Sequence, residues 1–230
     1  MPTHLITGAG AGIGAAIAEA LSARGDELFL VARTDERAGD LRERYAGCRT
    51  LVADLSDPSG LEESLSRQDL PKGLDSLVHV AGVVDLGPVG ELSAEVWRRT
   101  MDVNLLAPAE LTRLCLPALR ASRGHVVLVN SGAGLHANPG WSAYAASKHA
   151  LRALADSLRG EEKQAGVRVT SVYPGRTATG MQEKVHGQEG KEYDPSAWIA
   201  PESVATAVLT ALDLPRDAEM TDVTVTPGPR

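Results

Sequence analysis

Residues 1–14, MPTHLITGAGAGIG, join a short apolar run to a glycine at every second position from Gly8 to Gly14. Glycine costs conformational entropy on folding, so this density indicates that something must approach the main chain closely. A helical pattern follows over residues 15–23. The free N–H groups of a helix start attract phosphate, so strand, glycine loop and helix together predict a nucleotide site. A purely structural glycine-rich turn is the alternative.

Composition limits the classes of function. The 230 residues are 43% hydrophobic, which is enough for a sizeable core. The net charge of -7 argues against binding to nucleic acid. The two cysteines, Cys48 and Cys115, form no CxxC pair, so no metal site is expected and a reducing, cytoplasmic setting is favoured. A strand pattern begins within a few residues of Met1, which leaves no room for a signal peptide, and no membrane segment is expected.

Short β-rich runs alternate with longer helical patterns. Several runs, such as residues 77–80 and 126–129, are apolar on both faces, which suits a parallel sheet covered by helices on each side. We therefore expect an α/β fold with a doubly wound, seven-stranded parallel sheet in one domain, residues 1–230. Residues 176–200 look irregular and polar, and we expect them to form a loop or lid on the substrate side. The expected strands are 3–7, 27–32, 49–53, 76–80, 124–130, 167–173 and 222–226; the expected helices are 12–24, 36–45, 59–67, 93–99, 104–122, 142–164 and 201–213.

The end of the second predicted strand bears on the choice of cofactor. In dinucleotide sites an acidic residue here bonds the ribose 2′-hydroxyl, whereas an arginine accommodates a 2′-phosphate. This strand ends in Ala32-Arg33-Thr34, so the acid is missing and a guanidinium follows its place. Guanidinium groups bind phosphate through paired, charge-assisted hydrogen bonds. The sequence therefore favours NADP(H) over NAD(H); a solvated surface arginine is the alternative, because Asp35 and Glu36 lie nearby.

Three residues after the fifth predicted strand suggest proton transfer. Ser131 follows that strand directly, and Tyr144 and Lys148 lie four positions apart in a helical pattern, so they face the same way. An ammonium beside a phenol is expected to lower a pKa that is otherwise about 10. Ser131 would bond a substrate oxygen while Tyr144 passes the proton. An ordinary amphipathic helix is the alternative for the tyrosine and lysine taken alone.

Taken together, these motifs resemble the short-chain dehydrogenase/reductase family, in its compact single-domain branch, over essentially the whole chain. Residues 7–14 fit the family's TGxxxGIG, Ala81-Gly82 fits the end of its NNAG motif, and Pro174-Gly175 fits the motif after the sixth strand. The resemblance implies a Rossmann-type sheet and a catalytic set of Asn104, Ser131, Tyr144 and Lys148, with Asn104 supporting a water-linked proton relay to the lysine. The cofactor-binding residues expected from the motifs and the resemblance are Thr7, Gly8, Gly10, Gly12, Ile13, Gly14, Arg33, Thr34, Asp54, Leu55, Ala81, Gly82, Asn104, Tyr144, Lys148, Pro174, Gly175, Thr177 and Thr179.

The chain departs from the family pattern in two places. His79 and Val80 replace the two asparagines of NNAG, which removes side-chain bonds that tie neighbouring strands. The stretch after Pro174-Gly175 is short, which predicts a small or open substrate pocket. His136 and Trp141 fall in the region that lines this pocket in the family, although ordinary loop packing would also explain them.

The sequence thus predicts an NADP(H)-dependent oxidoreductase that interconverts an alcohol and a ketone or aldehyde, acting on a small molecule. The resemblance also implies a homodimer or homotetramer, paired through helices 104–122 and 142–164. One alternative is a non-catalytic NADP(H)-binding regulatory protein, which has no need of all four catalytic residues. Another is a sugar-nucleotide epimerase or dehydratase of the longer branch, whose chains usually carry a sizeable C-terminal substrate domain.

Overall fold

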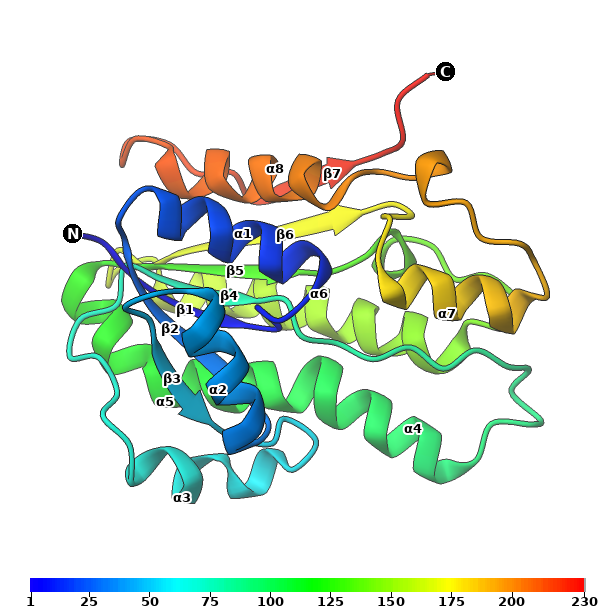
Figure 1. Cartoon of the computed structure of the whole chain (residues 1–230), viewed down its shortest axis with the longest axis horizontal. Helices are drawn as coiled ribbons and strands as arrows, with labels where there is room; N and C mark the ends of the chain where they lie inside the picture. The colour runs from blue at the N-terminus through cyan, green and yellow to red at the C-terminus, as the bar shows by residue number, and fades with distance from the viewer. Residues whose placement is uncertain (230) are drawn as a thin grey trace.

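The computed structural model describes residues 1–229, and a seven-stranded parallel sheet forms its centre (Figure 1). The strand order is β3-β2-β1-β4-β5-β6-β7, so the chain reverses direction across the sheet between β1 and β4. Parallel neighbours need crossover connections, and helices supply them. The predicted doubly wound, single-domain fold is confirmed. The strands are β1 (Thr3–Thr7), β2 (Glu27–Ala32), β3 (Arg49–Val52), β4 (Ser76–His79), β5 (His125–Val129), β6 (Arg168–Pro174) and β7 (Asp222–Val225).

Helices cover both faces of the sheet. One apolar cluster joins the sheet to helices α1, α2 and α8, and a second joins its other face to α3, α5 and α6. Figure 1 shows α1 and α8 on one side of the strands and α5 on the other. The inner strands are buried on both faces, as all five residues of β5 illustrate. The helices are α1 (Gly12–Ala23), α2 (Asp35–Arg44), α3 (Leu61–Ser66), α4 (Ala94–Met101), α5 (Ala107–Ser122), α6 (Ser142–Glu162), α7 (Gly180–Glu189) and α8 (Pro201–Asp213).

Strand β4 ends one residue earlier than the sequence suggests. The backbone N–H groups of Val80 and Ala81 donate to the Thr7 hydroxyl, at 3.0 and 3.1 Å, instead of continuing a strand ladder. Thr7 is the last residue of β1 and is 1% exposed. One buried hydroxyl therefore joins the ends of the two strands at which the sheet changes direction. His79, which stands where the family has an asparagine, instead bonds Thr112 of α5 at 2.9 Å.

The region 94–122 is helical throughout, whereas the sequence suggested a break after residue 99. Helix α4 runs into a π-helical turn, Asp102–Leu106, which leads directly into α5. Single π-helical turns are frequent at functional sites, because they widen the helix and re-aim its side chains. This turn contains Asn104.

The prediction that residues 176–200 are irregular was wrong for ten of them, since α7 spans Gly180–Glu189. The Thr179 hydroxyl caps the helix start by accepting from the Gln182 N–H at 3.3 Å, and Gly190 ends the helix at φ +67°. These caps stabilise a helix whose apolar pattern is weak. A 3₁₀ turn, Pro195–Ala197, follows before α8.

Candidate active site

The glycine loop between β1 and α1 leaves no room for side chains on its inner side. A Cβ on Gly8 would lie 2.8 Å from the Ala81 backbone nitrogen, and a Cβ on Gly14 would lie 2.1 Å from the Gly8 carbonyl oxygen. Gly8 and Gly12 also adopt φ of +75° and +53°, which other residues avoid. Gly10 is exposed at the tip, with open space around it. The main chain can therefore approach a pyrophosphate at the start of α1, as the sequence predicted.

A cavity of about 470 Å³ opens at the carboxyl ends of the strands, beside this loop. In doubly wound sheets ligands bind at this edge, where the strand order reverses. The cavity brings together residues from the glycine loop, the end of β4, the end of β5, helix α6 and the segment after β6. Among the residues expected from the sequence, it is lined by Gly8, Gly12, Ile13, Ala81, Gly82, Ser131, Trp141, Tyr144, Lys148, Pro174, Gly175, Thr177 and Thr179.

Ser131, Tyr144 and Lys148 meet at this cavity. Ser131 follows β5, and its hydroxyl accepts from the Ala133 N–H at 3.1 Å, which fixes its direction. Tyr144 and Lys148 lie one turn apart on α6 and are 6% and 4% exposed. The Lys148 Nζ donates to the Val129 carbonyl oxygen at 3.1 Å and lies 5.8 Å from the centre of the Tyr144 ring. The three side chains thus converge on this one cavity.

The protonation of this pair differs from the expectation. Burial raises the pKa of Tyr144, and its bond with Ser131 offsets this only in part. Burial also lowers the pKa of Lys148, to about 8. The expected lowering of the Tyr144 pKa was wrong in direction, because the cost of burying a phenolate dominates. Near neutral pH, Tyr144 therefore holds its proton, and Lys148 is mostly an ammonium.

Asn104 supports the site from the π-helical turn. Its Oδ1 accepts from the Val83 N–H at 2.8 Å, and its Nδ2 donates to the Val83 carbonyl at 2.9 Å and to the Ser147 hydroxyl at 3.0 Å. Ser147 in turn donates to the Tyr144 carbonyl at 2.7 Å. Asn104 is 1% exposed and lies behind the cavity wall formed by Gly82. Its side chain therefore connects the segment after β4 to α6.

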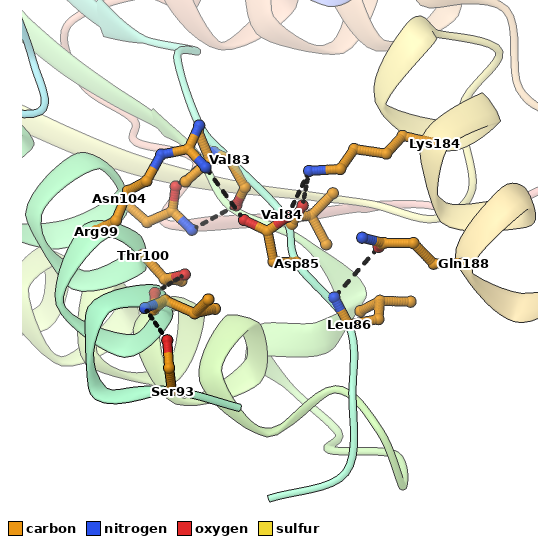
Figure 2. Close-up of polar contacts among 11 residues, drawn as sticks. Val83, Val84, Asp85, Leu86, Ser93, Arg99, Thr100, Asn104, Lys184 and Gln188 are labelled. Atoms are coloured by element: carbon orange, nitrogen blue, oxygen red, sulfur yellow. Dashed lines mark hydrogen bonds and ion pairs between the residues drawn. The ribbon is translucent and has the colours of Figure 1, made fainter. Parts of the chain in front are cut away.

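Helix α7 covers the cavity and is tied to the same segment (Figure 2). The Lys184 Nζ donates to the Val84 carbonyl at 2.7 Å and pairs with Asp85 at 2.5 Å. Asp85 also faces Arg99 of α4, at 3.4 Å, and the Gln188 side chain accepts from the Leu86 N–H at 3.2 Å. The contacts of Lys184 and Gln188 join residues about 100 positions apart, so no local sequence signal could have revealed them.

Eight residues expected to bind the cofactor lie outside the cavity lining: Thr7, Gly10, Gly14, Arg33, Thr34, Asp54, Leu55 and Asn104. Arg33 and Thr34 are exposed at the end of β2, where Thr34 caps α2 by accepting from the Arg37 N–H at 3.3 Å. Burial opposes ionisation of Asp54, but hydrogen bonds from Ser56 and the charge of Arg33 lower its pKa overall. Leu55 packs partly against the core. The sequence did not single out Arg44, which donates to the Gly10 carbonyl at 3.2 Å and forms an ion pair with Glu19 of α1.

Of the two candidate pocket residues, only Trp141 lies at the cavity, and His136 does not. Trp141 lines the cavity and packs edge-on against Tyr144, with ring centres 5.9 Å apart. His136 is exposed and lies outside the lining, because the turn after Ser131 directs it to the surface. Thr7 is also not a lining residue, since its hydroxyl is used by Val80 and Ala81. Residues of the lining that the sequence did not indicate include Arg176, Gln182 and Val84.

The rest of the described chain adds two observations. No group of three or more His, Cys, Asp or Glu side chains within residues 1–229 is placed to hold a metal ion. No helix in the same residues is long and apolar enough to cross a membrane. The donors that converge on the cavity are instead backbone N–H groups, hydroxyls and cations, which suit a dinucleotide.

Comparisons with known proteins agree with a dinucleotide-dependent oxidoreductase. A family model described as short chain dehydrogenase matches residues 2–190, so the chain belongs to that family. It is 34% identical to the glycine betaine reductase ATRR of Emericella nidulans, over 97% of this chain but only 18% of that protein. It is also 34% identical to the oxidoreductase UcpA of Escherichia coli O157:H7, over 96% of this chain and 84% of that one. The structure matches an alcohol dehydrogenase from Thermococcus sibiricus complexed with 5-hydroxy-NADP, with a TM-score of 0.84, 27% identity and coverage of 100% and 99%.

Proposed function

We propose that the protein is an NADP(H)-dependent oxidoreductase that interconverts an alcohol and a ketone or aldehyde. The observation that carries this proposal is the convergence of Ser131, Tyr144 and Lys148 on a cavity whose other wall is the glycine loop. A nucleotide-binding regulator would need the loop alone. The cofactor, when bound, supplies the hydride acceptor or donor, and the chain supplies binding, orientation and proton transfer.

Tyr144 is the proposed general acid for reduction and general base for oxidation. Burial keeps its proton in place near neutral pH, which favours the acid role. Ser131 donates a hydrogen bond to the substrate oxygen and so stabilises the charge that develops there. Lys148 has two roles: its positive charge favours proton loss from Tyr144, and it holds the cofactor ribose. Asn104 positions the segment after β4 and supports the route by which the proton is replaced.

The cofactor would lie along the glycine loop, with its pyrophosphate at the start of α1. Ala81, Gly82, Pro174 and Gly175 border the same cavity and would hold the nicotinamide half. Arg33 supports a preference for the 2′-phosphate of NADP(H), because it is exposed and does not repel a phosphate as an acidic side chain would. It is also close enough to Asp54 to lower the pKa of that carboxyl.

The proposal is tested by following NADPH absorbance with a panel of aldehydes and ketones, and by repeating the assay with Tyr144→Phe. This change keeps the ring, so the fold and NADPH affinity should stay close to wild type. Turnover should fall by roughly 10²–10⁴-fold, the usual contribution of a general acid. If no carbonyl compound is reduced while NADPH binds tightly, the regulatory alternative is favoured. If Tyr144→Phe keeps more than about half of the turnover, Tyr144 is not the proton donor.

A cytoplasmic location and a homodimer or homotetramer remain part of the proposal. The π-helical turn, α5 and α6 carry apolar residues that pack only partly against the core, among them Leu105, Leu114, Leu116 and Leu154. Light scattering at micromolar concentration tests the assembly, since a mass near the 24.2 kDa of one chain would contradict it.

A further inference from the structure

The charges that face the cavity are all positive. Its lining contains no aspartate or glutamate among residues 1–229, and its cations are Lys148 and Arg176. Lys148 already donates to the Val129 carbonyl and stands beside Tyr144. Arg176 instead packs over the Trp141 ring, and Trp141 in turn packs against the Tyr144 ring. Arg176 is therefore the charge that a substrate, as distinct from the cofactor, would meet.

Arg176 is held in a fixed place by aromatic rings and one carboxylate. Its guanidinium carbon lies 5.9 Å from the centre of the Trp141 ring and 5.4 Å from that of Trp198. Its Nη2 donates to both carboxylate oxygens of Glu189, at 2.7 and 2.9 Å, so this pair uses one of its three nitrogens. Nε and Nη1 are not part of the pair. A guanidinium presents its donors in a planar fork, so the N–H groups of Nε and Nη1 remain for a second anion.

The charge of Arg176 is only partly balanced by Glu189. The same carboxylate accepts from the Lys191 ammonium at 3.2 Å, so one negative charge faces two positive ones. Bonding to Arg176, and secondarily to Lys191, keeps the pKa of Glu189 below its usual range, so it stays ionised. Glu189 is well shielded, with 14% of its side chain exposed. The group of three therefore carries a net positive charge at the edge of the cavity.

Tyr144 packs into an apolar cluster, and four members of this cluster also line the cavity: Val84, Ala133, Trp141 and Val185. Trp141 contacts the Tyr144 ring with its own ring and Arg176 with its face, so it lies between the proton donor and the guanidinium. Charge pairs are stronger where water is excluded. A ligand that places an oxygen at Tyr144 and follows Trp141 would bring its far end to Arg176.

We propose that Arg176 selects substrates that carry a carboxylate at the end of a short apolar chain, remote from the reacting carbonyl or alcohol. The carboxylate would accept from the Arg176 edge that Glu189 does not use, and the apolar chain would lie along Trp141 and Val185. The inference rests on the proposed function, because it assigns the substrate class of the same site. The alternative hypothesis is that Arg176 is purely structural and only holds the end of α7 through Glu189.

The test uses methyl ketones that carry a terminal carboxylate at graded chain length, each beside its methyl ester. Reduction is followed by NADPH absorbance in wild type and in Arg176→Met. The wild-type enzyme should prefer at least one acid to its ester in kcat/KM. The ratio of acid to ester should fall by roughly ten- to a hundredfold in Arg176→Met, the usual range for hydrogen bonds to charged groups. The ratio cancels the intrinsic reactivity of each pair and any general damage to the fold.

Two further variants sharpen the test. Arg176→Lys keeps the charge but not the fork, so it should retain part of the acid preference. Lys191→Met removes the same charge from the same end of α7 without touching the cavity lining, and it should change the ratio less than about threefold. If Lys191→Met lowers the acid-to-ester ratio as much as Arg176→Met, the acid preference comes from the overall electrostatic field rather than from contact with Arg176. The proposal is then wrong.

The outcomes separate this inference from the function on which it rests. If esters are reduced but no acid is preferred to its ester, Arg176 is structural and the oxidoreductase assignment stands. The same conclusion follows if Arg176→Met lowers kcat/KM for acids and for esters by the same factor. If neither esters, acids nor the wider panel of carbonyl compounds consume NADPH, the proposed function itself fails.

Discussion

The side-chain amide of Asn104 bonds both backbone groups of Val83, accepting from its N–H at 2.8 Å and donating to its carbonyl at 2.9 Å. Val83 begins the segment whose next residues, Val84 to Leu86, are held by Lys184 and Gln188 of α7. The asparagine of the π-helical turn and the helix over the cavity thus hold the same few residues of backbone (Figure 2). The position of α7 is therefore coupled to that of the backbone at Val83, whose neighbours Gly82 and Val84 line the cavity.

Asn104→Ala should lower turnover more than it lowers cofactor affinity. It leaves both polar groups of the part-buried Val83 without their partner, which costs up to about 1–3 kcal/mol for each group. Asn104→Asp keeps the acceptor for the Val83 N–H and should be intermediate. Kinetics, NADPH titration and thermal unfolding measure the three effects. The control is Thr100→Val on the same helical run, which removes the bond to the Val96 carbonyl but does not touch Val83. Turnover of Asn104→Ala within twofold of wild type would contradict the role of this bond pair.

We expect the low pKa of Lys148 to set the pH range of activity. Burial lowers it to about 8, so the ammonium is present below pH 8 and lost above it. We expect kcat/KM for reduction to be flat from pH 6 to 7.5 and to fall by up to about tenfold per pH unit above 8. Lys148→Arg keeps the charge and should remove this break, although at a lower plateau. Exposed Lys184→Arg is the control. A profile that stays flat to pH 10 in wild type would show that the charge is not needed.

Arg33 should make NADPH bind at least about tenfold tighter than NADH, in line with two charge-assisted bonds to a 2′-phosphate. Titration by fluorescence or calorimetry measures both affinities. Arg33→Ala should lose most of the preference by weakening NADPH and leaving NADH nearly unchanged. Arg37→Ala is the matched control, because that arginine is exposed on α2 and paired with Asp40. Equal affinities in wild type, or a preference that survives Arg33→Ala, would remove the argument for NADP(H).

How far the sequence leads can be judged from particular residues. The inner strands were predictable because their residues are apolar on both faces, and Tyr144 and Lys148 were predictable because a four-residue spacing on a helix is local. The meeting of Lys184 with Asp85, or of Thr7 with Val80, is not local and depends on the whole sheet. These long-range contacts could not be read from the chain.

Helix α7 was missed although its ends carry signals. Thr179 with Gln182 three residues later matches the start of a capped helix, and Gly190 is a typical helix end. Its interior obscured them, because Gly187 and the polar residues give little apolar periodicity. The direction of the Tyr144 pKa was missed for another reason: its burial depends on Trp141 and the folded cavity rather than on its neighbour in the helix.

Two buried histidines should make the protein sensitive to acid. His79 bonds Thr112 at 2.9 Å and His125 bonds Thr170 at 2.7 Å. Burial lowers the pKa of each to about 3, with Arg168 and Arg216 adding to the effect at His125. Unfolded histidine titrates near 6.5, so below that pH the unfolded chain binds more protons, and stability is lost as the pH falls toward 3. At pH 5 each histidine should remove about 2 kcal/mol of the free energy of unfolding.

Urea unfolding at pH 7 and pH 5 measures this loss. His79→Gln and His125→Gln should each reduce the difference between the two pH values by about that amount, whatever their effect at pH 7. His136→Gln, at an exposed position, should leave the difference unchanged. If both His79→Gln and His125→Gln keep the wild-type difference in stability between pH 7 and pH 5, these two histidines are not the cause of the acid sensitivity.

The pairing of β1 with β4 has a consequence for the order in which the protein folds. His4 of β1 pairs with Ser76 of β4 across 72 positions of chain, and the contact of Gly8 with Ala81 lies at the same junction. Closing so long a loop costs entropy before any contact repays it, and non-local parallel pairing slows folding. We expect the junction to form late, so that a refolding chain acquires most of its helices before it can hold a nucleotide. The recovery of NADPH binding would then follow the slowest phase of refolding rather than the return of secondary structure.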